Sequence, residues 1–144
     1  MTTLARRVFP FVASAALGAV QACHGHGEAD ESRRAEAGRI AEAVRVLRAA
    51  PNDGKRPFLK SLREVGCTAE ELCALKQSCA DAYELEVTAF DGISAVRRSV
   101  RGADPVAPDA IELLTKSEAN LKRARDLTRA CVESEGAVRR RYSL

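Results

Sequence analysis

The chain has 144 residues, which is room for one small domain. Arg6 and Arg7 supply two of its 23 basic side chains, so residues 23–144 carry 21 basic groups against 20 acidic ones, a balance that argues against nucleic acid as a partner. Trp is absent and aromatic residues make up 4%, which favours an all-α fold with small core side chains over a β-sandwich.

The first 22 residues have the layout of a secretory signal peptide. "MTTLARR" supplies a short positive segment, and "VFPFVASAALGAV" follows as an apolar run of 13 residues. A membrane-spanning helix needs roughly 20 apolar residues, so the run is short for that role. Residues 1–22 are therefore predicted to direct export.

Val20-Gln21-Ala22-Cys23 ends this segment and resembles the lipobox of bacterial lipoproteins. The resemblance implies that the Cys23 thiol receives a diacylglyceryl group, that the chain is cut before Cys23, and that acyl chains such as palmitate then hold it on a membrane. His24 follows in place of the Asp that retains lipoproteins at the inner membrane, which by resemblance favours the outer membrane of the cell envelope. Two alternatives remain: ordinary export as a soluble periplasmic or secreted protein with Cys23 free, and an uncut leader.

The number of cysteines agrees with lipidation. An exported protein usually pairs its thiols, and an odd one is a liability. If Cys23 carries lipid, an even number remains for disulfides. The remaining four are Cys67, Cys73, Cys79 and Cys131.

Residues 23–33 are predicted to be a flexible tether, because they are polar and include two glycines. His24 and His26 lie in this segment. Two imidazoles are weak candidates for binding copper, nickel or zinc. A plain spacer is the preferred interpretation, and no cofactor is expected.

Residues 34–144 are predicted to form the helical domain. Apolar residues recur at helical spacing from about 32 to 50, and the loop "PNDGKRP" follows. "PFLKSLREV", residues 57–65, predicts a short helix. Thr68 and Glu71 have the spacing of a capping box at the start of a long helix that ends at Gly102.

After the turn "ADPVAP", a last helix is predicted over residues 108–135. Two long helices joined by a short turn predict an antiparallel helical hairpin, with one or two additional N-terminal helices against it. In such a hairpin Cys79 lies almost opposite Cys131. Six helical residues rise about 9 Å, too far for Cys73 to bridge Cys79 on one helix, which leaves Cys67 to pair with Cys73.

No catalytic residues are predicted, because both histidines lie in the tether, outside the helical domain. Two groups of arginines lie at predicted helix C-termini, where cations offset the helix dipole. They are Arg97, Arg98 and Arg101, and then Arg139, Arg140 and Arg141. Contact with an anionic partner is the alternative role. Glu86 is the one charged residue on an otherwise apolar stripe. The sequence thus predicts a non-catalytic envelope lipoprotein with a structural or protein-interaction role. It does not identify an envelope partner. The alternative is a metal- or ligand-binding module that uses His24 and His26.

Overall fold

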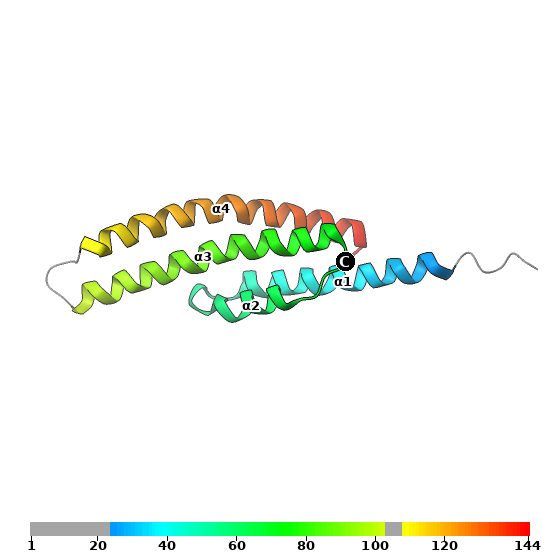
Figure 1. The fold of residues 1–144 in the computed structure, drawn as a ribbon, viewed down its shortest axis with the longest axis horizontal. Helices are drawn as coiled ribbons and strands as arrows, with labels where there is room; N and C mark the ends of the chain where they lie inside the picture. The colour runs from blue at the N-terminus through cyan, green and yellow to red at the C-terminus, as the bar shows by residue number, and fades with distance from the viewer. Residues whose placement is uncertain (1–23, 103–107) are drawn as a thin grey trace, which may run out of the picture.

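A computed structural model describes residues 24–102 and 108–144, apart from the side chains of residues 24–26, 102 and 108. Within these ranges the chain forms helices and no strand, so the all-α prediction is confirmed. The molecule is elongated (Figure 1). Its elements are α1 (His24–Ala49), the 3-10 turn η1 (Asn52–Gly54), α2 (Lys55–Glu64), α3 (Glu70–Gly102) and α4 (Pro108–Tyr142).

The two longest helices, α3 and α4, lie side by side in opposite directions along most of the molecule (Figure 1). Small side chains are buried along both, which lets the helix axes approach closely. Gly92 shows how close the approach is: a Cβ at this position would collide with Ser117 Oγ and lie 3.3 Å from Leu113 Cδ1. The other small buried residues of the two helices include Ala82, Ala89, Ala110 and Ala124.

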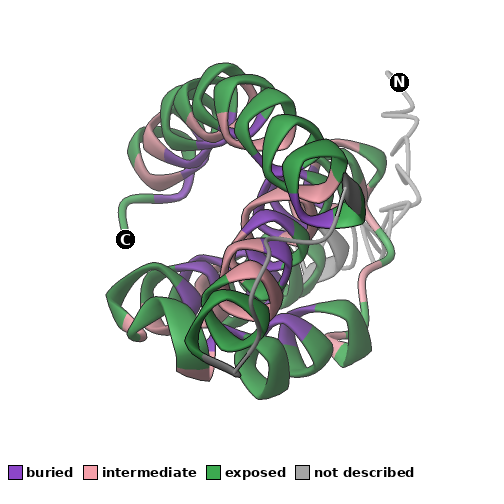
Figure 2. Cartoon of the chain, turned by 90° about the vertical axis from the view of Figure 1, so that its left-hand side faces the viewer, coloured by how far each residue is buried: buried purple, intermediate pink, exposed green. Residues whose placement is uncertain are grey.

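Helices α1 and α2 cover the half of this pair that contains the start of α3 and the end of α4 (Figure 1). All four helices contribute buried residues there, on the sides that face one another (Figure 2). Each buried Leu, Ile or Val contributes about 1.5–3 kcal/mol relative to its exposed state. Members of this core include Ile40, Val44, Leu47, Leu59, Leu62, Leu72 and Tyr83.

The flexible tether predicted for residues 23–33 is wrong for residues 24–33, because the structure places them in α1. After Gly27 the segment "EADESRR" consists of residues that tolerate a helix well. Asp30 and Arg34 stand four residues apart in the orientation that stabilises a helix. These favourable contributions outweigh the cost of the glycines at 25 and 27.

The last helix extends seven residues beyond its predicted end at 135. Val138 and Tyr142 are buried in the core, at positions that continue the spacing of Cys131 on the same helix face. The Tyr142 hydroxyl also donates a hydrogen bond to Glu71 Oε1 at 2.7 Å. Tertiary contacts therefore hold the last two turns in place.

The predicted capping box at the start of α3 is also wrong. Thr68 and Glu71 do not bond each other; the carboxylate of Glu36 from α1 takes the place of the box. Its Oε1 accepts hydrogen bonds from the backbone N–H groups of Thr68 (2.6 Å) and Ala69 (3.2 Å), and its Oε2 accepts the Thr68 hydroxyl at 2.6 Å. A residue 32 positions earlier in the chain thus satisfies donors that open a helix.

Two disulfides are present, as predicted, and they join the two predicted pairs. Cys79 of α3 is bonded to Cys131 of α4 with a Cα–Cα distance of 5.0 Å, and both residues are fully buried. Cys67 is bonded to Cys73 with a Cα–Cα distance of 5.4 Å at the start of α3. The first bridge staples the two long helices, and the second closes the turn that enters α3.

Candidate functional site

Cys23, the predicted lipidation site, lies outside the described residues, and α1 begins at the next residue. The structure accounts for the other four cysteines in its two disulfides. Cys23 is therefore the one cysteine of the chain without a place in this pairing. The start of α1 lies at one end of the elongated molecule (Figure 1).

His24 and His26, the candidate metal ligands, are the first and third residues of α1. Positions two apart on a helix do not face each other. Within the described part of the chain, no group of three or more His, Cys, Asp or Glu side chains is arranged to hold a metal ion.

A polar contact on a buried carboxylate links α1 to α4. Glu135 of α4 is 4% exposed and accepts Arg48 of α1 through Oε2 and Arg139 through Oε1 at 2.9 Å. Arg48 Nε lies 3.4 Å from the Tyr83 hydroxyl of α3. A buried carboxylate held by two guanidinium groups fixes how α1 lies on α3 and α4.

Glu86, the charged residue on the apolar stripe, forms a second such contact. Its Oε1 lies 3.3 Å from Lys55 Nζ at the start of α2, and both side chains are largely buried. The Lys55 ammonium also lies 5.2 Å from the ring centroid of Tyr83, within cation–π range. Glu86 therefore has a structural partner that the sequence stripe did not reveal.

The arginine group at 139–141 takes part in packing. Besides the pair of Arg139 with Glu135, Arg141 lies 3.3 Å from Glu71. The hydrogen bond from Tyr142 is the main cause that lowers the pKa of Glu71 below its usual value. These contacts connect the end of α4 to the start of α3, which favours the structural interpretation of this group.

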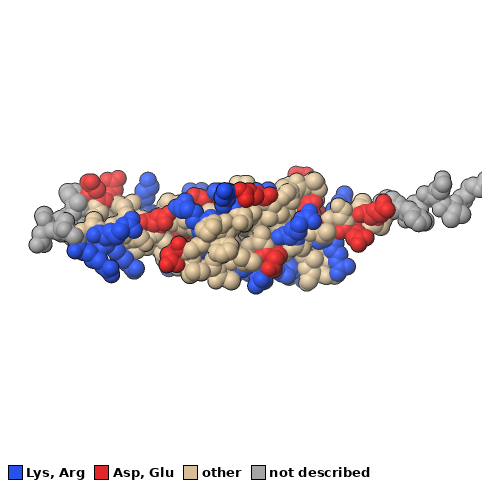
Figure 3. Space-filling model, turned by 90° about the horizontal axis from the view of Figure 1, so that it is seen from below, with Lys and Arg blue, Asp and Glu red and all other residues tan. Residues whose placement is uncertain are grey.

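The other group, Arg97, Arg98 and Arg101, is exposed near the end of α3. Lys and Arg side chains gather at this end of the molecule in Figure 3. No ion pair joins these three arginines to any residue in the described ranges 24–102 and 108–144. Arg139 and Arg141 of the C-terminal group do form such ion pairs. Contact with an external anion therefore remains the alternative role of Arg97, Arg98 and Arg101.

Comparisons with protein-family models, with curated proteins and with solved structures find no match to this chain. In the part of the chain that the structure describes, no helix combines the length and hydrophobicity needed to cross a membrane. The observations that bear on function are therefore the odd cysteine, the stapled helices and the distribution of exposed charge.

Proposed function

We propose that this chain is an envelope lipoprotein, attached to a membrane through lipid on Cys23, whose disulfide-stapled antiparallel hairpin serves a structural or protein-interaction role without catalysis. The observation that carries the proposal is the pairing of the cysteines. Cys67, Cys73, Cys79 and Cys131 bond one another, and the remaining thiol belongs to the lipobox-like "VQAC".

The dimensions of the fold support a role as a projecting element. α4 has 35 residues and spans about 52 Å at 1.5 Å per residue. α1 continues about 18 Å past Glu36, which meets the start of α3. A molecule attached next to His24 would thus present the end of α3 and the start of α4 about 70 Å from its membrane.

Intact mass measures both halves of this proposal. The protein is purified from the membrane fraction of a lipoprotein-producing bacterium and weighed before and after reduction and alkylation. We expect a chain that starts at Cys23, carries added acyl mass, and gains four alkyl groups only after reduction. Cys23→Ser is the matched variant, because it keeps the apolar leader and removes the thiol that would carry the lipid.

If the mass shows no acyl groups, the lipoprotein proposal is wrong and soluble export takes its place. Cys23 would then be alkylated without reduction. An unchanged membrane fraction for Cys23→Ser, with the leader still attached, would identify the leader itself as the anchor. Four thiols that alkylate freely would contradict the stapled hairpin and leave the lipid result unaffected.

A further inference from the structure

The face of α3 and α4 that α1 and α2 cover in one half of the molecule continues, uncovered, into the other half (Figure 1). On α3, Tyr83, Phe90 and Arg97 succeed one another at intervals of seven, so they lie along one helix face. Tyr83 is 1% exposed beneath Arg48 and Lys55, Phe90 is half-buried, and Arg97 is exposed. The cover ends near Phe90.

The facing side of α4 shows the same gradient. Glu135, Thr128, Leu121 and Leu114 also recur at intervals of seven. Glu135 is buried against Arg48 of α1, Thr128 and Leu121 are half-buried, and Leu114 is 47% exposed. Ile111 lies one turn further out and is 65% exposed.

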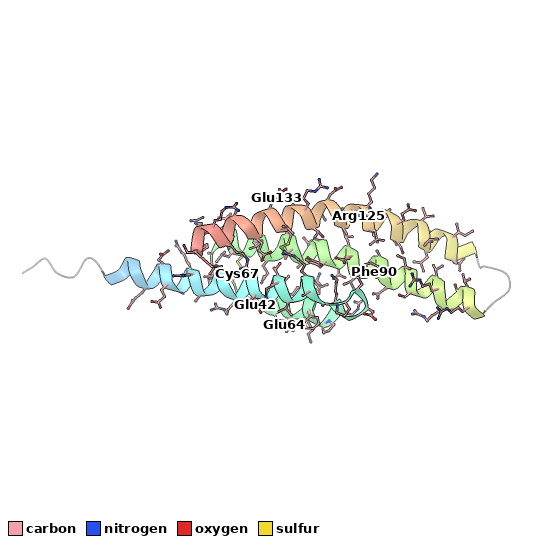
Figure 4. The ribbon with its side chains drawn as sticks, turned by 180° about the vertical axis from the view of Figure 1, so that it is seen from behind. Glu42, Glu64, Cys67, Phe90, Arg125 and Glu133 are labelled. Atoms are coloured by element: carbon pink, nitrogen blue, oxygen red, sulfur yellow. A yellow bond between two sulfur atoms is a disulfide. The ribbon has the colours of Figure 1, made fainter. Side chains whose placement is uncertain are left out.

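Between these two faces runs a groove, which we call the distal groove. Its inner part has a volume of about 380 Å³ and is lined by Glu86, Phe90, Leu121, Ala124, Arg125 and Thr128. Figure 4 shows Phe90 on α3 close to the turn between α1 and α2, and Arg125 on α4 at a similar place along the molecule. Outward, Arg97, Arg101 and Leu114 continue the same two faces. The groove therefore prolongs the path along which α1 lies on α3 and α4.

The charges along the distal groove determine the kind of occupant. Arg125 lines it together with Glu86, which Lys55 holds. Further out, the exposed Arg97 and Arg101 follow on the same face of α3, and Glu118 follows on α4. A second copy of the chain would bring like charges together across this face. A flat anionic bilayer would meet the arginines but would leave the recessed Phe90 and Leu121 without contact. A helix with an apolar stripe and acidic flanks satisfies both features.

We propose that the distal groove binds an acidic amphipathic helix of a partner protein, which lies on α3 and α4 as a continuation of α1. From Phe90 to Arg101 the face of α3 continues outward from the groove for about 16 Å, the length of three helical turns. Leu114 and Leu121 contact the apolar stripe of the partner, and Arg97 and Arg101 bind its carboxylates. This inference extends the proposed interaction role but does not require lipid on Cys23, so the two can fail separately.

The test uses the oxidised protein from the bacterial envelope, held in phosphatidylcholine nanodiscs where it carries lipid, and three lactam-stapled helical peptides. All three share one stripe of leucines, and their flanking positions are all Glu, all Gln or all Lys. Fluorescence anisotropy should give a Kd for the Glu peptide about tenfold below that for the Gln peptide, with the Lys peptide weakest. R97E/R101E should reverse this order, and Leu114→Gln should weaken all three peptides alike.

The matched control is R123E/R140E, which makes the same change in net charge at exposed arginines away from the distal groove. It should leave the order of the three peptides unchanged, and circular dichroism should show native helix content for each variant. Equal affinity for the three peptides, or the same effect from both arginine pairs, would overturn the proposal. So would concentration-dependent self-association, or binding to phosphatidylglycerol vesicles without binding of the Glu peptide.

Discussion

The Glu36 carboxylate accepts three hydrogen bonds at the start of α3, and these bonds make the stability of the protein depend on pH. The hydroxyl of Thr68 is the main cause that lowers the pKa of Glu36 below its ordinary value of 4.5; burial opposes it, and the N–H groups of Thr68 and Ala69 add to it. Just below pH 4.5, the Glu36 carboxyl therefore binds fewer protons in the folded protein than in the unfolded chain. The contribution of Glu36 is full above pH 4.5 and is lost as pH falls through the folded-state pKa.

Glu36→Gln should therefore lower the free energy of unfolding by about 1.5–3 kcal/mol near pH 7, the range for hydrogen bonds to a charged group. The variant should also lose part of the decline in stability between pH 5 and pH 3. Urea unfolding across this range measures both effects. Glu31→Gln, at an exposed position on the same helix, is the control. An equal pH slope for Glu36→Gln and wild type would show that the cap does not act through its charge.

Gly92 sits where α3 packs closely against α4, and two opposing effects meet there. Replacing a helical Gly by Ala gains about 1 kcal/mol in helix propensity, whereas forcing a methyl group into a packed interface costs about 1–3 kcal/mol. Because the added Cβ would collide with Ser117 Oγ, we expect Gly92→Ala to destabilise. In a Ser117→Ala background the same change should become neutral or stabilising. Thermal unfolding of wild type, Gly92→Ala, Ser117→Ala and the double variant gives the sign of the stability change in each background. The same sign in both backgrounds would show that Ser117 does not cause the effect of Gly92→Ala.

Among the elements, the two disulfides should differ in what they contribute. In the chain-entropy description, the bridge that spans 52 residues stabilises by about 4 kcal/mol and the one that spans six by about 2 kcal/mol. Cys79 and Cys131 are also fully buried, so their replacement leaves unfilled space. We expect C79A/C131A to lose more stability in urea unfolding than C67A/C73A. A larger loss from C67A/C73A would show that the entry to α3 matters more than the staple between the long helices.

The helices that repeated apolar spacing predicted are present, and the errors lie at their ends. A capping box is a local pattern, and Thr68 and Glu71 match it, but the nearby carboxylate of Glu36 competes for the same donors. The end of α4 was missed although Val138 and Tyr142 continue its spacing. The prediction of a tether is wrong because it rests on polarity and glycine content and neglects the helix propensity of "EADESRR". In each case, propensity or tertiary contacts prevailed over a local signal.

For the whole molecule, the sequence contained the pairing of the cysteines but not the distal groove. Tyr83 and Phe90 occupy equivalent places in the repeat of α3, and nothing local distinguishes the covered from the uncovered position. The difference arises because α1 ends at Ala49 and the chain turns back through η1 into α2. The 33 and 35 residues of α3 and α4 run past that turn. A groove that depends on where other helices stop requires their three-dimensional arrangement.

This uneven cover predicts uneven local stability. Amide hydrogens open with a free energy that reflects the buried contacts around them. The helix segments 72–87 of α3 and 124–142 of α4 are held by α1, α2, the Cys79–Cys131 bridge and the Glu135 contacts. Segments 93–101 and 110–118 contact mainly each other, and Val100, Ile111 and Leu114 are exposed. Hydrogen exchange should therefore be faster in the distal segments, by roughly tenfold for each 1.4 kcal/mol of lost protection.

Hydrogen–deuterium exchange with mass spectrometry measures this gradient on the oxidised protein. Adding the acidic stapled peptide should slow exchange in segments 93–101 and 110–118 and leave 72–87 unchanged, because a bound helix would supply the cover that α1 and α2 give the other half. R97E/R101E should keep the gradient and lose the response to the peptide. Uniform protection along α3 in the free protein would mean that the two long helices stabilise each other over their full length. The distal groove would then need no third helix to cover it, which would contradict the expected gradient.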